Sequence, residues 1–166
     1  MITVKQLLSF LLLSMFSVVT MAQEEGEIFV DNGIKYTVTS PTTVAVKGRG
    51  ENKAEKLVIP EKVRNYTVSA IADWAFFFDS DLQGISIPKT VTSIEERAFY
   101  GCKSLKAFEI PKSVTEMGYG VFRLCEQLTK ISLPEGITSM GEGFFEGCIY
   151  NHRTTKTNQK YPSVNL

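Results

Sequence analysis

The chain has 166 residues, of which 43% are hydrophobic and 22% are charged, and its formal net charge is zero. This length and composition are typical of one soluble globular domain. Acidic residues outnumber basic ones between residues 23 and 148, so this part of the chain gives no electrostatic footprint for nucleic-acid binding and we expect no nucleic-acid partner.

The first 22 residues have the features of a secretory signal peptide. Lys5 precedes an apolar run over residues 7–19, and the small residue Ala22 follows at a suitable cleavage position. The run is too short for a transmembrane helix, so we expect no integral membrane segment after removal of residues 1–22. We expect an exported protein that is secreted, periplasmic or associated with the cell surface. Because no cysteine lies near Ala22, we do not expect a lipoprotein.

Residues 23–56 are predicted to form a β-rich N-terminal cap and a connector. Residues 28–30 and 34–38 flank the sequence Asp-Asn-Gly at 31–33, which is a strong hairpin signal. Residues 43–46 predict a third strand. A cap is expected because the end of a repeat array otherwise exposes an apolar face.

From residue 57 to residue 148 the sequence repeats about four times, with a period of 23 residues. A fixed period in this range indicates a solenoid, in which each unit buries its apolar face against its neighbours. Each recurring position should therefore stack into a ladder, with units about 4.8 Å apart where their strands pair. The ladders are Phe76, Phe99, Phe122 and Phe145; Ile71, Ile94, Met117 and Met140; Val68, Val91, Val114 and Ile137; and Leu82, Leu105 and Leu128.

Each unit is predicted to contain one strand and one helical turn. The strands precede the Ile-Pro and Leu-Pro pairs within residues 82–88, 105–111 and 128–134, where the last apolar residues alternate. Residues 98–102 predict a short helical turn closed by a glycine. These elements predict a solenoid of short strands and helical turns behind a β-rich N-terminal cap.

One frame recurs through the units, and its positions are Ile87, Pro88, Val91, Ile94, Ala98, Phe99, Cys102 and Leu105, with their counterparts in adjacent units. This frame resembles the BspA-like leucine-rich repeats of bacterial surface and secreted proteins, over about residues 57–148. The resemblance implies an α/β-type leucine-rich repeat fold class, a curved solenoid with one parallel sheet on its concave side. It also implies adhesion to host or matrix proteins and no general catalytic residues.

The reactive side chains do not form a recognisable catalytic or metal site. Cys102, Cys125 and Cys148 share one repeat phase, which Asp79 occupies in the first unit. We expect a buried ladder of free thiols, and the alternative is a disulfide between adjacent units, which export would permit. The absence of a Cys-x-x-Cys pair argues against zinc, and the polar segment around His152 offers nothing to orient a catalytic base. We predict no enzyme activity, no cofactor and no metal.

Two surfaces are candidate ligand sites. Trp74, Phe77 and Tyr100 occupy phases that hold charged residues or glycine in other units, which predicts an exposed aromatic patch unless the cap or an insertion in the first unit covers it. The concave face should present the strand residues that alternate with the buried ones, either as a weakly specified ligand site or as solvated surface. These are Lys56, Val58, Gly84, Ser86, Ala107, Glu109, Lys130 and Ser132, of which Lys56, Ser86, Glu109, Lys130 and Ser132 are the candidate contacts.

The C-terminal residues 149–166 form a polar, basic tail that does not continue the repeat frame. The last repeat therefore lacks a recognisable cap, and we expect that this end can mediate self-association. The leading hypothesis is a secreted, non-enzymatic protein that binds host or matrix proteins through a solenoid face. The alternatives are a glycan- or peptide-recognition module, in which the aromatic patch matters more, and a structural spacer or fragment of a longer array without its own ligand.

Overall fold

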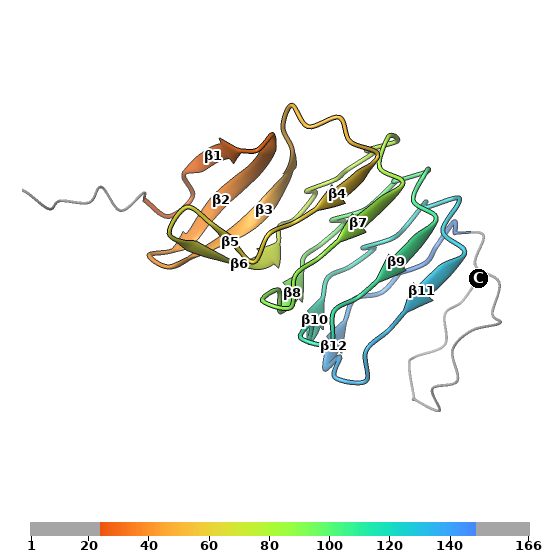
Figure 1. Cartoon of the computed structure of the whole chain (residues 1–166). Coiled ribbons are helices and arrows are strands. Elements are labelled where there is room, and N and C mark those ends of the chain that lie inside the picture. Colours follow the sequence, from red (N-terminus) through yellow and green to blue (C-terminus); the bar gives the residue numbers. More distant parts are fainter. Residues whose placement is uncertain (1–23, 149–166) are drawn as a thin grey trace, which may run out of the picture.

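Residues 24–148 of the computed structural model are described below; the predicted signal peptide and the basic tail lie outside them. They form a solenoid of stacked coils with short strands on its two long sides and an antiparallel strand unit at its N-terminal end (Figure 1). No α-helix occurs between residues 24 and 148.

The N-terminal unit contains the three strands that the sequence predicts: β1 (Ile28–Asp31), β2 (Ile34–Ser40) and β3 (Thr43–Arg49). β1 and β2 pair in antiparallel fashion around Asn32 and Gly33, which both have positive φ angles of 46° and 73°. Two positive φ angles in a two-residue loop are the geometry that Asn-Gly favours. The predicted hairpin is therefore confirmed.

The N-terminal unit is continuous with the solenoid through an eight-stranded sheet. β3 pairs in parallel with the first coil, and each following coil adds one short parallel strand to the same sheet. The strand of the first coil also pairs with β5, which comes from the inserted residues of that coil. These coil strands are β5 (Lys62–Val63), β6 (Tyr66–Ile71), β8 (Ser93–Ile94), β10 (Glu116–Met117) and β12 (Ser139–Met140).

The opposite side carries the strands that the Ile-Pro and Leu-Pro pairs predict, one in each coil. They are parallel and lie in sequence order along the solenoid (Figure 1). The prediction of a single parallel sheet is wrong, because these strands form two separate pairs and the eight-stranded sheet occupies the other side. The strands are β4 (Lys56–Val58) paired with β7 (Gly84–Ser86), and β9 (Ala107–Glu109) paired with β11 (Lys130–Ser132).

The predicted ladders form the core between the two sides. The rings of Phe76 and Phe99 stack with their centroids 5.2 Å apart, and those of Phe99 and Phe122 with centroids 5.5 Å apart. Phe145 continues the stack at 6.3 Å from Phe122 but is only half-buried. Because each interior ring packs against an identical ring on both sides, the repeat period sets the core directly.

The predicted helical turns are wrong, and the α/β description fails with them. The N–H groups of Phe99 and Gly101 donate to carbonyls of the next coil, those of Val121 and Arg123, at 3.0 and 2.8 Å. The intervening Tyr100 N–H donates to the Arg97 carbonyl within its own coil, at 3.0 Å. An α-helix would require successive N–H groups to bond four residues back in the same segment. Here every second donor holds two coils together, so the segment is a corner.

Two candidate ligand-binding surfaces

Each corner is built on two backbone positions with positive φ, four residues apart. Side chains with a Cβ are disfavoured at such angles, at about 1 kcal/mol or more, whereas glycine adopts them readily. The first position holds Trp74, Arg97, Gly120 and Gly143, and the second holds Phe78, Gly101, Leu124 and Gly147. Glycine recurs at these positions because the backbone has a positive φ there. Aligning the repeat units did not provide this reason.

The first coil fills both of its corner positions with aromatic residues that face solvent. Trp74, Phe77 and Phe78 are 40%, 44% and 48% exposed, and Tyr100 from the second coil is half-buried beside them. Neither the N-terminal strands nor the insertion covers them. Phe77 lies at the centre, with its ring centroid 4.7 Å from those of Trp74 and Phe78 and 5.4 Å from that of Tyr100. These four residues are called the aromatic corner below.

Phe78 belongs to this surface although sequence reasoning missed it. Its ring lies over Gly101, where an added Cβ would approach it to 2.7 Å. The glycines at positions 101 and 147 in the same phase were the signal that could have identified a left-handed corner.

A cation links the aromatic corner to the third coil. The Arg97 guanidinium lies 4.6 Å from the centroid of the Trp74 ring and 4.9 Å from that of the Tyr119 ring, and it also pairs with Glu96. Cation–π contacts of this kind hold the guanidinium in place. Trp, Tyr and Arg, which meet at this surface, are the residue types that dominate protein–protein hot spots.

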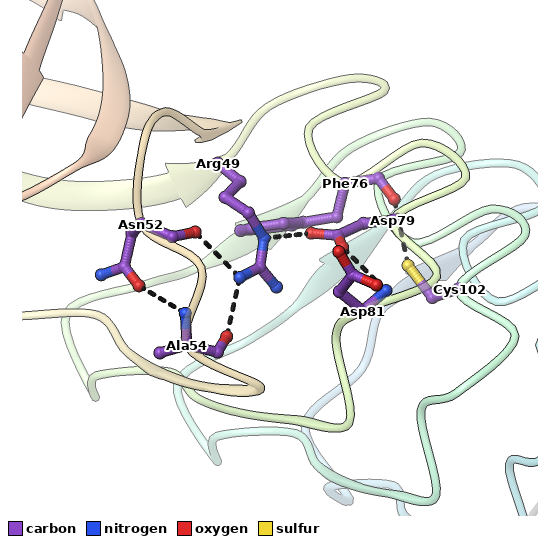
Figure 2. Close-up of polar contacts among 7 residues, drawn as sticks. All are labelled: Arg49, Asn52, Ala54, Phe76, Asp79, Asp81 and Cys102. Carbon is purple, nitrogen blue, oxygen red and sulfur yellow. Dashed lines mark hydrogen bonds and ion pairs between the residues drawn. The ribbon is translucent and has the colours of Figure 1, made fainter.

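An ion pair anchors the aromatic corner to the N-terminal strands. Arg49 Nε donates to Asp79 Oδ2 at 2.7 Å, and its Nη1 donates to the carbonyls of Asn52 and Ala54 at 2.9 and 2.7 Å (Figure 2). The two charged side chains are only 15% and 12% exposed. Because Asp79 directly follows Phe78, this pair positions the end of the corner.

The cysteines occupy the phase of Asp79 in the later coils. Each thiol donates to a phenylalanine carbonyl of the preceding coil: Cys102 to Phe76 at 3.0 Å (Figure 2), Cys125 to Phe99 at 3.1 Å, and Cys148 to Phe122 at 2.9 Å. The predicted buried ladder of free thiols is confirmed for Cys102 and Cys125, while Cys148 is half-buried. Burial, with a further contribution from Asp79, raises the pKa of the Cys102 thiol.

The face formed by β4, β7, β9 and β11 carries a shallow groove of about 610 Å³. Its centre is lined by small residues, including Gly84 and Ala107, while Lys56 and Lys130 lie on its outer two strands. A volume of this size is within the range of small-ligand sites, although the groove is open. The five candidate contacts predicted for the concave face all line it: Lys56, Ser86, Glu109, Lys130 and Ser132.

Other kinds of site are not found in the described part of the chain. Between residues 24 and 148 no group of three or more His, Cys, Asp or Glu side chains is placed to hold a metal ion. Within the same residues no helix is long and apolar enough to cross a membrane. His152 lies outside the described residues.

Comparison with known proteins agrees with this architecture. A leucine-rich repeat protein from Bacteroides ovatus is 36% identical with a TM-score of 0.69, over 74% of this chain and 33% of that one, so the chain spans 33% of that relative's length. A leucine rich cell surface protein from Faecalibacterium prausnitzii is 24% identical with a TM-score of 0.61, over 77% of this chain and 44% of that one. A leucine-rich repeat protein from Bacteroides capillosus is 20% identical with a TM-score of 0.65, over 75% of this chain and 98% of that one. The last two likenesses concern the fold alone.

No curated protein matches the sequence. Residues 50–163, however, match the BspA type leucine rich repeat region in 6 copies. The chain therefore belongs to the BspA-type leucine-rich repeat family.

Proposed function

We propose that this protein is an exported, non-enzymatic binding protein that engages host or matrix proteins through the aromatic corner. The observation that carries the proposal is the placement of Trp74 and Phe78 at left-handed positions that the fourth coil gives to Gly143 and Gly147. Holding exposed aromatic rings there is unfavourable for the isolated chain, and strain of this kind marks functional surfaces. The signal-peptide pattern of residues 1–22 supports export.

The chemistry of the aromatic corner favours a protein partner with an apolar recess. Three neighbouring rings are each close to half exposed, and covering them would remove a large apolar area from water. Arg97 and Glu96 lie at the edge of the rings and supply a polar rim. This combination of an apolar centre and a polar rim is the usual anatomy of a protein interface.

The repeat itself supplies the variant that tests this proposal. The triple substitution Trp74→Gly, Phe77→Glu and Phe78→Gly introduces the residues that the fourth coil carries at the same three positions, so the backbone can accept it. Residues 23–166 would be purified, shown to be folded by circular dichroism, and tested by surface plasmon resonance against immobilised matrix proteins and glycans at physiological salt.

For a matrix protein that binds the native chain saturably, we expect the triple variant to lose at least about 30-fold in affinity, which is the loss of one hot spot of about 2 kcal/mol. The matched control is Ser86→Arg, which places a long side chain in the groove and should leave the affinity unchanged. Undiminished binding by a folded triple variant would exclude the aromatic corner as the contact surface.

The groove supports a second candidate function, recognition of an extended peptide or a glycan. Its small central residues leave room for a ligand across the strands, and Lys56 and Lys130 can meet acidic groups on either side. In this case Ser86→Arg and Lys130→Glu would weaken binding and the triple variant would not. A folded protein that binds nothing, and whose mass by light scattering rises with concentration, would instead support a self-associating spacer.

A further inference from the structure

The thiols of the third and fourth coils form a pair that the binding function does not use. Cys148 Sγ donates to the Phe122 carbonyl at 2.9 Å, and the same carbonyl accepts the Cys125 backbone N–H at 3.1 Å. The Cys148 sulfur therefore lies beside the Cys125 backbone. The side chains of Cys125 and Cys148 are also close enough to shift each other's pKa.

The spacing of the coils suits a covalent bridge between these two residues. The Leu124 N–H donates to the Glu146 carbonyl at 2.8 Å, so the backbones of these two coils pair beside the cysteines at a spacing of about 4.8 Å. Disulfides join residues whose Cα atoms are about 4.4 to 6.8 Å apart. A bond between equivalent positions of neighbouring coils thus requires rotation of the two side chains and no unstacking.

The two thiols differ in accessibility and in acidity. Cys125 is fully buried, whereas Cys148 is half-buried and can be reached from solvent. The neighbouring Cys125 side chain lowers the pKa of Cys148, and the Cys148 side chain together with burial raises the pKa of Cys125. Because the thiolate is the reactive form, Cys148 is the thiol that reacts first.

We propose that Cys125 and Cys148 form a reversible dithiol–disulfide site that closes when the protein meets a small-molecule disulfide such as oxidised glutathione. The Cys148 thiolate attacks one sulfur of the oxidant, the sulfur–sulfur bond of the oxidant breaks, and one small thiolate leaves. Cys125 then gives up its proton to solvent and attacks the Cys148 sulfur, which expels the second small thiolate. Two protein thiols are oxidised and one small disulfide is reduced to two thiols.

The bond would join the third coil to the fourth. It would restrict the unfolded chain and so stabilise these coils, and disulfides of this kind persist outside the cytoplasm. Cys102, fully buried with its thiol pKa raised, should stay reduced.

Tryptic mapping tests the proposal on the purified chain of residues 23–166, because cleavage after Lys and Arg places each cysteine in a different peptide. The reduced protein would be treated with excess oxidised glutathione at pH 8, quenched with acid, unfolded, alkylated and digested. We expect peptides 124–130 and 131–153 to be joined and lighter by two hydrogen atoms, with Cys102 fully alkylated. The oxidised protein should melt at a higher temperature than the reduced protein.

Two variants separate this reaction from a merely structural role. Cys125→Ser should trap glutathione on Cys148 as a stable adduct, because the second attack is lost. Cys148→Ser should show no adduct and no change in melting temperature with oxidant. The proposal would be overturned by native protein that stays fully alkylatable at Cys148 after prolonged treatment, or by a bond that joins Cys125 to Cys102. Either result would leave the proposed binding function untouched, since the aromatic corner lies on the first two coils.

Discussion

The first coil and the coils that follow it share one backbone frame but differ at the position of Asp79. In each later coil a cysteine thiol donates to a carbonyl of the preceding coil. The first coil has no preceding coil and packs instead against the non-repetitive N-terminal strands. Arg49 of these strands bonds both to Asp79 and to two carbonyls of the connector. Coils therefore stack on one another through weak contacts that are the same in each coil. The junction between the first coil and the N-terminal strands uses a specific ion pair instead.

The close approach at this junction also depends on one glycine. Gly48 in β3 has a φ of 124°, and a Cβ there would lie 2.0 Å from the Ala75 carbonyl oxygen. Such contact with backbone cannot be relieved by a side-chain rotation. The contact at the junction therefore depends on a glycine and an ion pair, whereas the later coils contact one another through stacked rings and thiol hydrogen bonds.

The largest expected effect comes from interrupting the phenyl stack in the regular coils. Phe99→Ala removes a fully buried ring that packs against Phe76 and Phe122, so we expect the free energy of unfolding to fall by about 4 kcal/mol. Phe145→Ala, at the half-buried end of the stack, should lose about half as much. Urea denaturation followed by circular dichroism measures both, and equal losses would show that stacking on two sides is not what stabilises the interior coils.

A second, somewhat smaller effect should come from giving the first coil the residue of the later coils. Asp79→Cys leaves Arg49 as a mostly buried charge without its partner, which should lower the free energy of unfolding by about 3 kcal/mol. The double variant Arg49→Met, Asp79→Cys removes both charges and should recover most of that loss. If the double variant is no more stable than the single one in urea denaturation, the ion pair is not the reason for the difference between the coils.

The third effect in order of size is expected from alkaline pH, which should lower the stability of the N-terminal strands. Burial, and secondarily Asp31, raises the pKa of Tyr36 to about 12 from an ordinary value near 10. The unfolded chain therefore ionises first, so the stabilisation is fully present below about pH 10 and is lost as the pH rises toward 12. Urea denaturation at a series of pH values should show a shallower decline for Tyr36→Phe than for the native chain, and identical slopes would contradict this contribution.

The smallest effect on stability is expected at the aromatic corner. Trp74→Gly relieves the left-handed backbone but loses the ring contacts, so its free energy of unfolding should stay within about 1 kcal/mol of the native value. Trp74→Ala loses the same contacts and keeps the Cβ at a φ of 56°, so it should be less stable than the glycine variant by about 1 kcal/mol. Thermal denaturation compares the two, and an alanine variant at least as stable as the glycine variant would argue against strain at this position.

Part of the candidate site could be predicted from the repeat alone. Aligning the units singled out Trp74 and Phe77, because other coils place glycine or charged residues in those phases. The same alignment left out Phe78, although Gly101 and Gly147 in its phase indicate the positive φ that the backbone adopts there. The pairing of Arg49 with Asp79 was also missed, because it joins residues 30 positions apart in two segments with no shared period.

The period of 23 residues by itself determined the interior: which rings and aliphatic side chains stack, where the strands β4, β7, β9 and β11 lie, and that the array is a solenoid. The Asp-Asn-Gly turn likewise determined the first hairpin, because two adjacent residues suffice to define it. The tertiary structure alone decided that the N–H groups of Phe99 and Gly101 bond to the next coil instead of forming a helix, and that β3 extends the sheet of the coils. A local sequence cannot distinguish these outcomes, since a backbone donor bonds to whichever carbonyl the stacking of neighbouring coils brings within reach.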